Sequence, residues 1–256
     1  MNIFVCLKQV PARDSVIRVD AAGSWIEEPN LSHEMNEPDA FALEEGLRLK
    51  EKHGGEVVTV SAGPARAAST IREALAKGAD RGILIEDDRF TDVDTLATAR
   101  ALAAALKKES CDLILTGLQS DDAGFGQTGV ILAELLGLPH ATIIMEVNVQ
   151  EGAISVKREL EAGWFQNVDI PLPALLTIQS GINKLRYATL MGIKKAKNKP
   201  LQRYSPDELG ADLTPSQIIR RLYTPQKTKG TQFLEGSPQE AAAKLAEKLK
   251  FEACVL

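Results

Sequence analysis

The sequence has few residues that could cross-link the fold or bind a metal. Its three cysteines lie far apart and form no CxxC pair, so they indicate neither a disulfide framework nor a zinc site. We interpret Cys6, Cys111 and Cys254 as buried or incidental thiols. The three histidines show no metal-binding spacing such as HExxH. We therefore expect no metal site.

Long apolar runs and an excess of basic residues are also missing. No run reaches the roughly 18 apolar residues that cross a bilayer, and the opening MNIFVCLKQV shows no signal-peptide pattern. The net charge of −5 argues against a general nucleic-acid binder. A chain of 256 residues with 44% hydrophobic content is long enough to bury a sizeable core. We expect a cytoplasmic protein without direct membrane insertion.

Common catalytic and nucleotide-binding signatures are absent too. There is no GxSxG nucleophile elbow, no Walker lysine and no GxGxxG fingerprint. The adjacent carboxylates Asp121 and Asp122 could serve as an acid and a base, but in a loop such residues more often cap a helix or stay solvated. We assign no catalytic residue. The chain is expected to bind a nucleotide without transforming it.

Strand and helix patterns alternate along most of the chain. Short apolar runs typical of buried strands occupy residues 2–7, 57–62, 83–85, 112–116, 141–149 and 172–178. Helix patterns cover residues 38–53, 65–77 and 92–110, and a fourth begins near Gln127. This alternation predicts right-handed βαβ crossovers. We expect an α/β fold with a doubly wound, mostly parallel, Rossmann-like nucleotide-binding sheet.

Two regions depart from this alternation. Residues 16–27 contain apolar residues on both sides of a turn and are expected to form a hairpin outside the main sheet. After residue 140, short strands follow one another without a helix between them. This pattern predicts antiparallel additions at one edge of the sheet.

The helix predicted over 38–53 begins just after Asn36. An asparagine there commonly caps the helix or forms an Asx turn, and direct contact with a ligand is the alternative. The apolar stripe of this helix consists of Phe41, Leu43, Leu47 and Leu49. Its charged residues are expected to point outward, namely Glu44, Glu45, Arg48, Lys50 and Lys52.

The chain is expected to divide near residue 200. Residues 1–200 would form the nucleotide-binding domain, and 201–256 an extended linker followed by a helix. The segment 201–236 is polar and contains three prolines, which favours a linker. The helix would begin at Ser237, with a proline in its first position and Glu240 in its third. A terminal amphipathic helix beyond a linker needs a surface to bury against.

Residues 111–133 predict a ligand site. They contain the buried strand 112–116, a glycine-rich loop and the start of a helix. In open α/β sheets, ligands bind beyond the carboxyl ends of the strands, where a helix N-terminus attracts an anion. Ser120, Gln127 and Thr128 could bond phosphate or ribose oxygens. A nucleotide-phosphate site and a purely structural βα turn both remain open.

Residues 181–199 combine isolated apolar residues with many basic residues. Leu190 and Met191 stand among lysines on both sides. An apolar anchor within a basic surround favours a partner-docking loop, because the anchor can fill a pocket while the charges steer an acidic partner. A solvated basic loop without a function is the alternative.

Several motifs in this order resemble the β subunit of electron transfer flavoproteins. They are VCLKQVP, MNEPDAFALEEGLRLKE, VSAGPA, REALAKGADRGI, the QTG loop and LRYATLMGIKKAK, which together cover nearly the whole chain. The resemblance implies a heterodimer with an α subunit that carries most of the site for the redox FAD. The C-terminal tail would reach across that subunit. Leu190 would anchor in a pocket of partner dehydrogenases, beside Tyr187, Met191, Lys194 and Lys195.

The resemblance also implies a nucleotide in this subunit, which is AMP in most members and a second, bifurcating FAD in others. The implied contacts are Cys6 through its backbone, Asn36, Glu37, Pro38, Asp39, Ala62, Asp122, Ala123, Gly124, Phe125, Gly126, Gln127, Thr128, Gly129, Val130 and Ala133. The QTG end of the loop favours AMP, although Phe125 and Gly126 depart from the usual pattern. Glu159 matches a carboxylate that faces an arginine of the α subunit near its flavin, and a surface salt bridge is its alternative role.

The implied function is electron transfer. The αβ pair would accept electrons from acyl-CoA-type or other flavin dehydrogenases and pass them to a membrane-linked, quinone-reducing oxidoreductase. In the bifurcating alternative, this chain would hold FAD and oxidise NADH, and would itself be an oxidoreductase. A stand-alone adenine-nucleotide regulator is a third reading, which the Leu190 loop and the tail helix disfavour.

Overall fold

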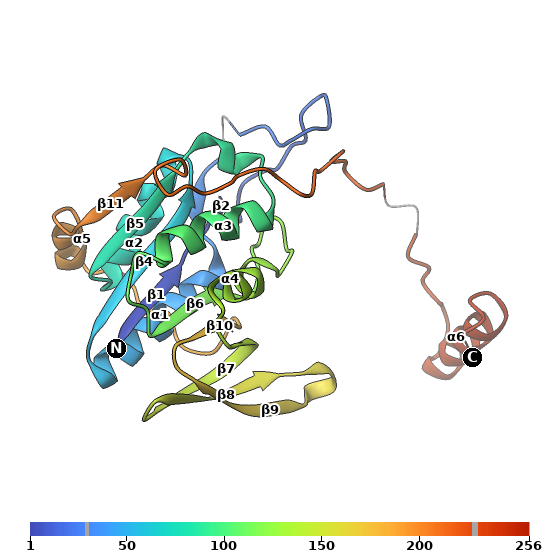
Figure 1. Ribbon diagram of the computed structural model, residues 1–256. Helices are drawn as coiled ribbons and strands as arrows, with labels where there is room; N and C mark the ends of the chain where they lie inside the picture. Colours follow the sequence, from blue (N-terminus) through green and yellow to red (C-terminus); the bar gives the residue numbers. More distant parts are fainter. Residues whose placement is uncertain (29–30, 227–229, 256) are drawn as a thin grey trace. The chain divides into compact units, whose positions relative to one another are not determined.

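The computed structural model describes residues 1–28, 31–226 and 230–255 (Figure 1). These residues divide into two compact units. We call the first the sheet unit; it comprises Met1–Arg18 and Ile26–Arg220. The second, the tail unit, comprises Val19–Trp25 and Arg221–Leu256.

The sheet unit is built on a nine-stranded sheet in the part of the chain that is described. Its strand order is β11-β5-β4-β1-β6-β10-β7-β8-β9. The bounds are β1 (Asn2–Cys6), β4 (Glu56–Gly63), β5 (Arg81–Glu86), β6 (Leu113–Gly117), β7 (His140–Gln150), β8 (Ala153–Glu159), β9 (Phe165–Pro171), β10 (Ala174–Ile178) and β11 (Leu201–Tyr204). The strands from β11 to β7 are parallel, whereas β8 and β9 are added antiparallel at one edge. The expected doubly wound α/β fold with antiparallel edge additions is confirmed.

Helices cover both faces of this sheet, as Figure 1 shows. Apolar side chains on one face pack with α1 (Glu37–His53), α2 (Ala68–Lys77) and α5 (Leu190–Ala196), and those on the other with α3 (Thr95–Leu106) and α4 (Thr128–Leu136). Side chains alternate across the central strand β1, so that Ile3 and Val5 join the first cluster while Phe4 joins the second. Burial on both faces explains why the strands read as continuous apolar runs.

Shorter elements complete the sheet unit. They are the two-stranded sheet of β2 (Gln9–Pro11) and β3 (His33–Met35), and the 3₁₀ turns η1 (Ala65–Ala67), η2 (Asp88–Thr91) and η3 (Glu161–Gly163). The hairpin expected over 16–27 is present in a shortened form, between residues 18 and 27. Within it, the N–H of Asp20 donates to the carbonyl of Trp25 at 2.8 Å, and the N–H of Glu27 donates to the carbonyl of Arg18 at 2.9 Å.

Two expectations about the sheet unit were wrong in detail, and one strand was not anticipated. Residues 201–204 do not begin a linker but form β11, which pairs in parallel with β5. Residues 165–171 form β9, a strand that the sequence patterns did not indicate. Glu44 and Glu45 of α1 do not point outward; each is only 6% exposed. Both carboxylates have partners far along the chain, which the helical period could not reveal.

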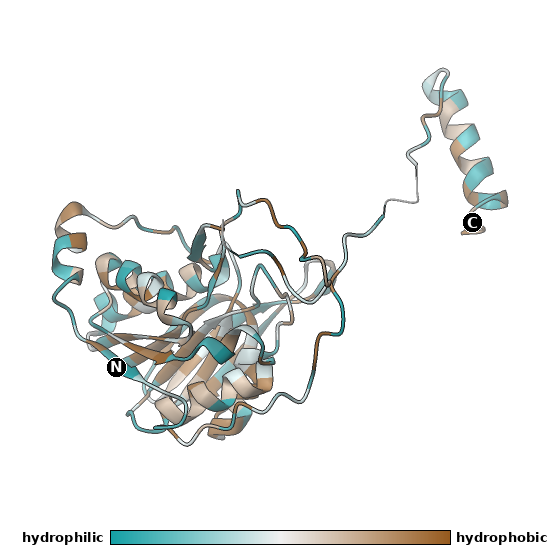
Figure 2. Ribbon diagram, turned by 90° about the horizontal axis from the view of Figure 1, so that it is seen from above, coloured by the Kyte–Doolittle hydropathy of each residue, from teal (hydrophilic) through white to brown (hydrophobic). Residues whose placement is uncertain are grey.

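The tail unit contains α6 (Pro238–Phe251). Its start is as expected, because the hydroxyl of Ser237 accepts from the N–H of Glu240 while the Glu240 side chain bonds back to Ser237. None of the residues of α6 is buried within the described structure, and apolar and polar residues alternate along the helix in Figure 2. No helix among the described residues is both long and apolar enough to span a membrane.

Candidate functional site

The strand order reverses at the centre of the sheet. From β1 the chain moves to β4 and β5 on one side, and it then returns to β6 on the other side of β1. Ligands of open α/β sheets bind beyond the carboxyl ends of the strands at such a reversal. The ends of β1 and β6, at Cys6 and Gly117, therefore mark the candidate site.

The glycine-rich loop follows β6 at this point and leads into α4. Gly124 and Gly126 have φ of +64° and +63°, which side chains rarely adopt. Gln127 is the N-cap residue of α4, and no side chain caps the helix. The first N–H groups of α4 therefore remain available to an anion, with the positive end of the helix dipole behind them.

Gly129 lets α4 approach the sheet closely. A Cβ atom at this position would come within 2.7 Å of both the Thr116 hydroxyl on β6 and a methyl group of Thr177 on β10. No larger residue fits there without a shift of the helix. The N-terminus of α4 is thereby seated directly on the carboxyl ends of two strands.

Asn36 holds the glycine-rich loop in place. Its side chain is buried, and its Nδ2 donates to the carbonyl of Gln119 at 2.9 Å while its Oδ1 accepts from the N–H of Asp121 at 2.9 Å. It makes no side-chain cap to α1. The sequence left a helix cap and an Asx turn open as local roles for Asn36, and the helix cap is not formed. The side chain clamps the loop instead.

Asp39 joins the ends of β1 and β6. Its Oδ2 accepts from the N–H of Lys8 at 2.7 Å, and its Oδ1 accepts from the N–H of Gly117 at 2.9 Å. Burial raises the pKa of this carboxyl group to about 7, against the opposing effect of these hydrogen bonds. Pro38 is buried beside it, and the N–H of Glu37 donates to Asp121 at 3.2 Å.

Lys8 is a site residue that sequence reasoning missed. Its ammonium lies 2.7 Å from Oδ1 of Asp122 and 3.3 Å from the hydroxyl of Ser120. Burial alone would raise the pKa of Asp122, but the Lys8 charge, with hydrogen bonds from Ser120 and the N–H of Ala123, lowers it. Its signal in the sequence is a lysine placed directly after an apolar strand, at the edge of the sheet where ligands of such folds bind.

The other expected nucleotide contacts belong to the strands, the loop and the helix that meet at this edge. Cys6 is buried, and burial raises the pKa of its thiol well above the ordinary value. Ala62 lies near the end of β4 and is half-buried, whereas Ala133 is buried within α4. Phe125 is exposed at the tip of the glycine-rich loop. The side-chain oxygen of Gln127 accepts from the hydroxyl of Thr95 at 3.1 Å.

Glu159 lies at the end of β8, on the same edge of the sheet. Its carboxylate accepts from Nε2 of Gln179 at 3.3 Å. Gln179 directly follows β10, whose last residue pairs with Gly117. In the part of the chain that is described, Glu159 forms no ion pair, so its alternative role in a surface salt bridge gains no support.

The expected docking residues lie elsewhere, on the face of the sheet that α2 covers. Tyr187 and Leu190 are 93% and 86% exposed, and Met191 is also exposed. Leu190 is the first residue of α5, which Thr189 caps by accepting from the N–H of Gly192 at 3.0 Å. The two expected lysines, Lys194 and Lys195, are exposed along the same helix.

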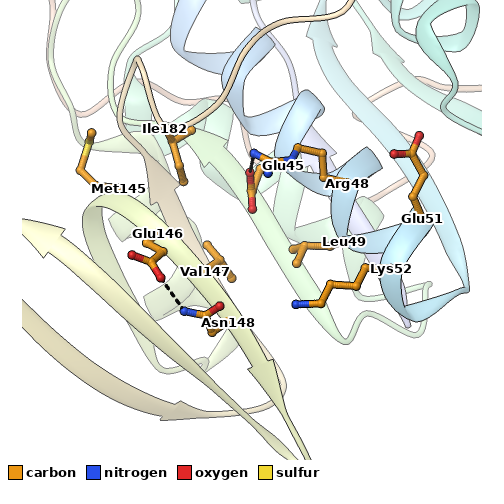
Figure 3. A pocket seen from close by; sticks show the side chains of 10 residues that line it. All are labelled: Glu45, Arg48, Leu49, Glu51, Lys52, Met145, Glu146, Val147, Asn148 and Ile182. Atoms are coloured by element: carbon orange, nitrogen blue, oxygen red, sulfur yellow. Dashed lines mark hydrogen bonds and ion pairs between the residues drawn. The ribbon is translucent and has the colours of Figure 1, made fainter.

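A groove of about 590 Å³ lies between α1 and β7 (Figure 3). Arg48 and Lys52 line it from the helix, and Glu146 and Asn148 from the strand, with Ile182 at one end. None of the expected nucleotide contacts lines this groove. Among the described residues, no cluster of three or more His, Cys, Asp or Glu side chains is arranged to hold a metal ion.

The fold and the reversal of strand order make the chain a doubly wound α/β protein, a class in which ligands, where they bind, lie at the carboxyl edge of the sheet. Residues 24–209 match the family model of the electron transfer flavoprotein domain. The chain is 38% identical to the electron transfer flavoprotein subunit beta of Methylophilus methylotrophus, over 96% of this chain and 97% of the relative. It is 37% identical to the human subunit beta over 96% and 97%. The chain belongs to the electron transfer flavoprotein family, as a β subunit.

Another relative carries a different name. The chain is 34% identical, over 98% of both chains, to the Caffeyl-CoA reductase-Etf complex subunit CarD of Acetobacterium woodii. Family membership places this chain in electron transfer and implies a flavin in the complex. It also implies an electron transfer flavoprotein α subunit as the partner.

Proposed function

We propose that this β subunit binds AMP at the carboxyl edge between β1 and β6. The observation that carries the proposal is the uncapped N-terminus of α4, which is seated beside the reversal of strand order. The phosphate would accept hydrogen bonds from the first N–H groups of α4, and Thr128 could add its hydroxyl. Asn36 and Lys8 would hold the loop in the shape that the nucleotide meets.

AMP would have a structural role in this site. Among the described residues of the site, no side chain is arranged as a nucleophile with an adjacent base, and the thiol of Cys6 is buried. The bound nucleotide would instead tie together the segments 36–39 and 122–129, which approach each other from distant parts of the sequence. Binding to the folded state alone stabilises that state by mass action.

The second part of the proposal is partner docking at Leu190. An exposed leucine between exposed Tyr187 and Met191, with lysines along the same helix, suits a shallow apolar pocket with an acidic rim. The partners would be acyl-CoA-type or other flavin dehydrogenases, which pass electrons to the flavin held mostly by the α subunit. A membrane-linked, quinone-reducing oxidoreductase would accept the electrons afterwards.

Two further features support a contact with the α subunit. Glu159 has no cationic partner among the described residues and would face an arginine of that subunit close to the flavin. The helix α6 leaves the apolar side chains of Leu245 and Phe251 exposed, and these would bury against the α subunit. In a heterodimer, Glu159 would have a cationic partner and the exposed apolar side chains of α6 would be buried.

The nucleotide content of the αβ complex tests the proposal. The two subunits are co-expressed and purified, and the nucleotides are extracted with acid, separated by chromatography and quantified per heterodimer. One FAD and one AMP would support the proposal. Two FAD and no AMP would mean that this chain holds a second flavin instead of AMP and acts in NADH oxidation. A β subunit that purifies alone, monodisperse and with ATP bound, would favour the alternative function as a stand-alone adenine-nucleotide regulator.

A further inference from the structure

Two neighbouring carboxylates of α1 are buried on the side of the helix that faces residues 183–199. Glu44 and Glu45 are each only 6% exposed. A buried carboxylate is costly unless it is paired and hydrogen-bonded. Both carboxylates find a partner in residues 183–199, which we call the docking loop.

Arg186 of the docking loop pairs with Glu44. Its Nε and Nη2 donate to the two carboxylate oxygens at 2.7 and 2.9 Å, so that two parallel hydrogen bonds join the guanidinium to the carboxylate. Its Nη1 donates to Glu51, about two helical turns further along α1, at 2.6 Å. Both bonding carboxylates raise the pKa of the Arg186 guanidinium.

Asn183 pairs with the second buried carboxylate. Its Nδ2 donates to Oε2 of Glu45 at 3.0 Å and to the carbonyl of Phe41 at 3.1 Å. The first four residues of the docking loop are therefore bonded to α1 at two successive points. This start of the loop cannot swing away from α1 without leaving the buried Glu44 carboxylate unpaired, and Glu45 would keep only Arg48, 3.6 Å away on α1 itself.

The end of the docking loop is bonded to a different helix. Nη1 of Arg72, on α2, donates to the carbonyls of Ala196 and Lys199 at 2.7 and 2.8 Å. The Lys199 ammonium donates in turn to carbonyls near the C-terminal end of α2. A Cβ atom at Gly192 would overlap the carbonyl oxygen of Ala76, so α5 packs directly on the backbone of α2.

Between these two anchors lies the exposed apolar tip. Tyr187, Leu190 and Met191 are accessible, although the chain on both sides of them is hydrogen-bonded to α1 and α2. A flexible loop loses conformational entropy when it binds, and a loop that is already ordered avoids much of this cost. The tip is therefore held ready before any partner arrives.

We propose that the Arg186–Glu44 pair is the positioning device of the docking loop. It fixes the start of the loop on α1, so that Leu190 is presented at one place to the pocket of a partner dehydrogenase. Neither residue touches the partner; both act through the loop. The inference rests on the proposed docking at Leu190, and it predicts a loss of affinity on removal of a pair that lies behind the docking surface.

The test uses the purified αβ complex with Arg186→Met, and Arg100→Met as the matched control. Arg100 forms an exposed ion pair with Asp212 at 3.4 Å and belongs to α3, on the other face of the sheet. Amide hydrogen exchange of residues 187–193 should accelerate about tenfold or more in Arg186→Met, since the loop loses the bonds that tie it to the buried Glu44 carboxylate. With a purified acyl-CoA dehydrogenase as electron donor, KM for the complex should rise about tenfold while kcat stays within about twofold. The control should change neither.

A conservative variant covers the case in which Arg186→Met does not fold. Arg186→Lys keeps the charge beside Glu44 but loses the two parallel bonds, so its exchange rate and KM should lie between those of the parent and Arg186→Met. Unchanged exchange in both variants, or a change no larger than in Arg100→Met, overturns the proposal.

The proposed docking itself is checked with Leu190→Ala. If that variant leaves KM unchanged while Arg186→Met still loosens the loop, docking at Leu190 is wrong and the positioning of the loop by Arg186 remains correct. If Leu190→Ala raises KM but Arg186→Met affects neither exchange nor KM, docking stands and the positioning role fails. The two failures are thereby distinguished.

Discussion

The ammonium of Lys8 lies 2.7 Å from Oδ1 of Asp122, 114 residues further along the chain. Lys8 follows β1, and Asp122 belongs to the loop that follows β6, so the pair joins the two strand ends between which the order of the sheet reverses. Ser120 accepts a second bond from the same ammonium at 3.3 Å. Lys8 thereby keeps the glycine-rich loop beside the end of β1.

Replacement of Lys8 by methionine should weaken AMP binding. The variant leaves the Asp122 carboxylate without its cation at a site proposed for a phosphate, and like charges repel. We expect about a tenfold higher Kd, in keeping with the loss of one charge-assisted hydrogen bond. Titration calorimetry on the AMP-depleted αβ complex measures it.

Lys107→Met is the control for this prediction. Lys107 follows α3 at the opposite edge of the sheet, before β6 begins, and its removal should leave the Kd for AMP unchanged. Equal affinity in the Lys8→Met and parent complexes would show that Lys8 does not shape the nucleotide site.

Asp39 should make the stability of the protein depend on pH. Burial raises the pKa of its carboxyl group to about 7 in the folded chain, from an ordinary value of 3.8. Between these two values the folded chain binds more protons than the unfolded chain, so the free energy of unfolding falls as pH rises. Above the folded pKa, the carboxylate is charged in both states and this contribution is constant.

The variant Asp39→Asn removes this titration. The stability of the parent complex relative to the variant should therefore fall between about pH 4 and pH 7 and level off above about pH 8. The midpoint of urea unfolding at each pH measures it. Asp88→Asn, a change in the exposed turn η2, should leave the pH profile of the parent intact. Parallel profiles for the parent and Asp39→Asn would contradict the assignment.

The central strands were predictable because they are apolar on both faces. Residues such as Ile3, Phe4 and Val5 alternate between the two apolar clusters, so the sequence shows an unbroken run whose length and flanking helices indicate a buried parallel strand. The strand β11 has the sequence LQRY and carries no such run. It forms because the free edge of β5 offers it backbone partners, which a local pattern cannot show.

The location of the candidate site could be predicted from the sequence, but the hydrogen bonds that hold it together could not. The glycine-rich loop indicates the edge of the sheet, since it follows a buried strand and precedes a helix. The roles considered for Asn36 were a local cap or a ligand contact, yet its side chain bonds to Gln119 and Asp121, more than 80 residues away. In the same way, Glu44 is buried because Arg186 reaches it from 142 residues away. Helical periodicity reflects only the residues of one helix, so it cannot reveal pairs with distant parts of the chain.

Leu190→Ala should impair docking alone. The leucine is 86% exposed, so its removal should not change the FAD or AMP content of the complex or its thermal stability. If it fills a pocket of the dehydrogenase, the loss of a buried side chain raises KM about tenfold or more while kcat changes little. Steady-state reduction of the αβ complex by an acyl-CoA dehydrogenase measures both.

Ile218→Ala is the matched control for this variant, because Ile218 is another highly exposed aliphatic residue of the sheet unit. It should leave KM at the parent value. A similar rise in KM for both variants would mean that any exposed apolar residue contributes, and docking would then not be centred on Leu190.

The helix α6 should be protected by the α subunit. It exposes Leu245, Phe251 and nearby Val255, and a surface of this kind on a terminal helix is stable in water only when another surface covers it. Leu245→Asp places a charge in that surface, so limited proteolysis of the αβ complex should cleave the tail about tenfold faster than in the parent. Glu247→Asp, which adds no charge, should be cleaved at the parent rate. If the tail of the parent is already cut as fast as that of Leu245→Asp, α6 does not bury this surface, and its proposed contact with the α subunit is wrong.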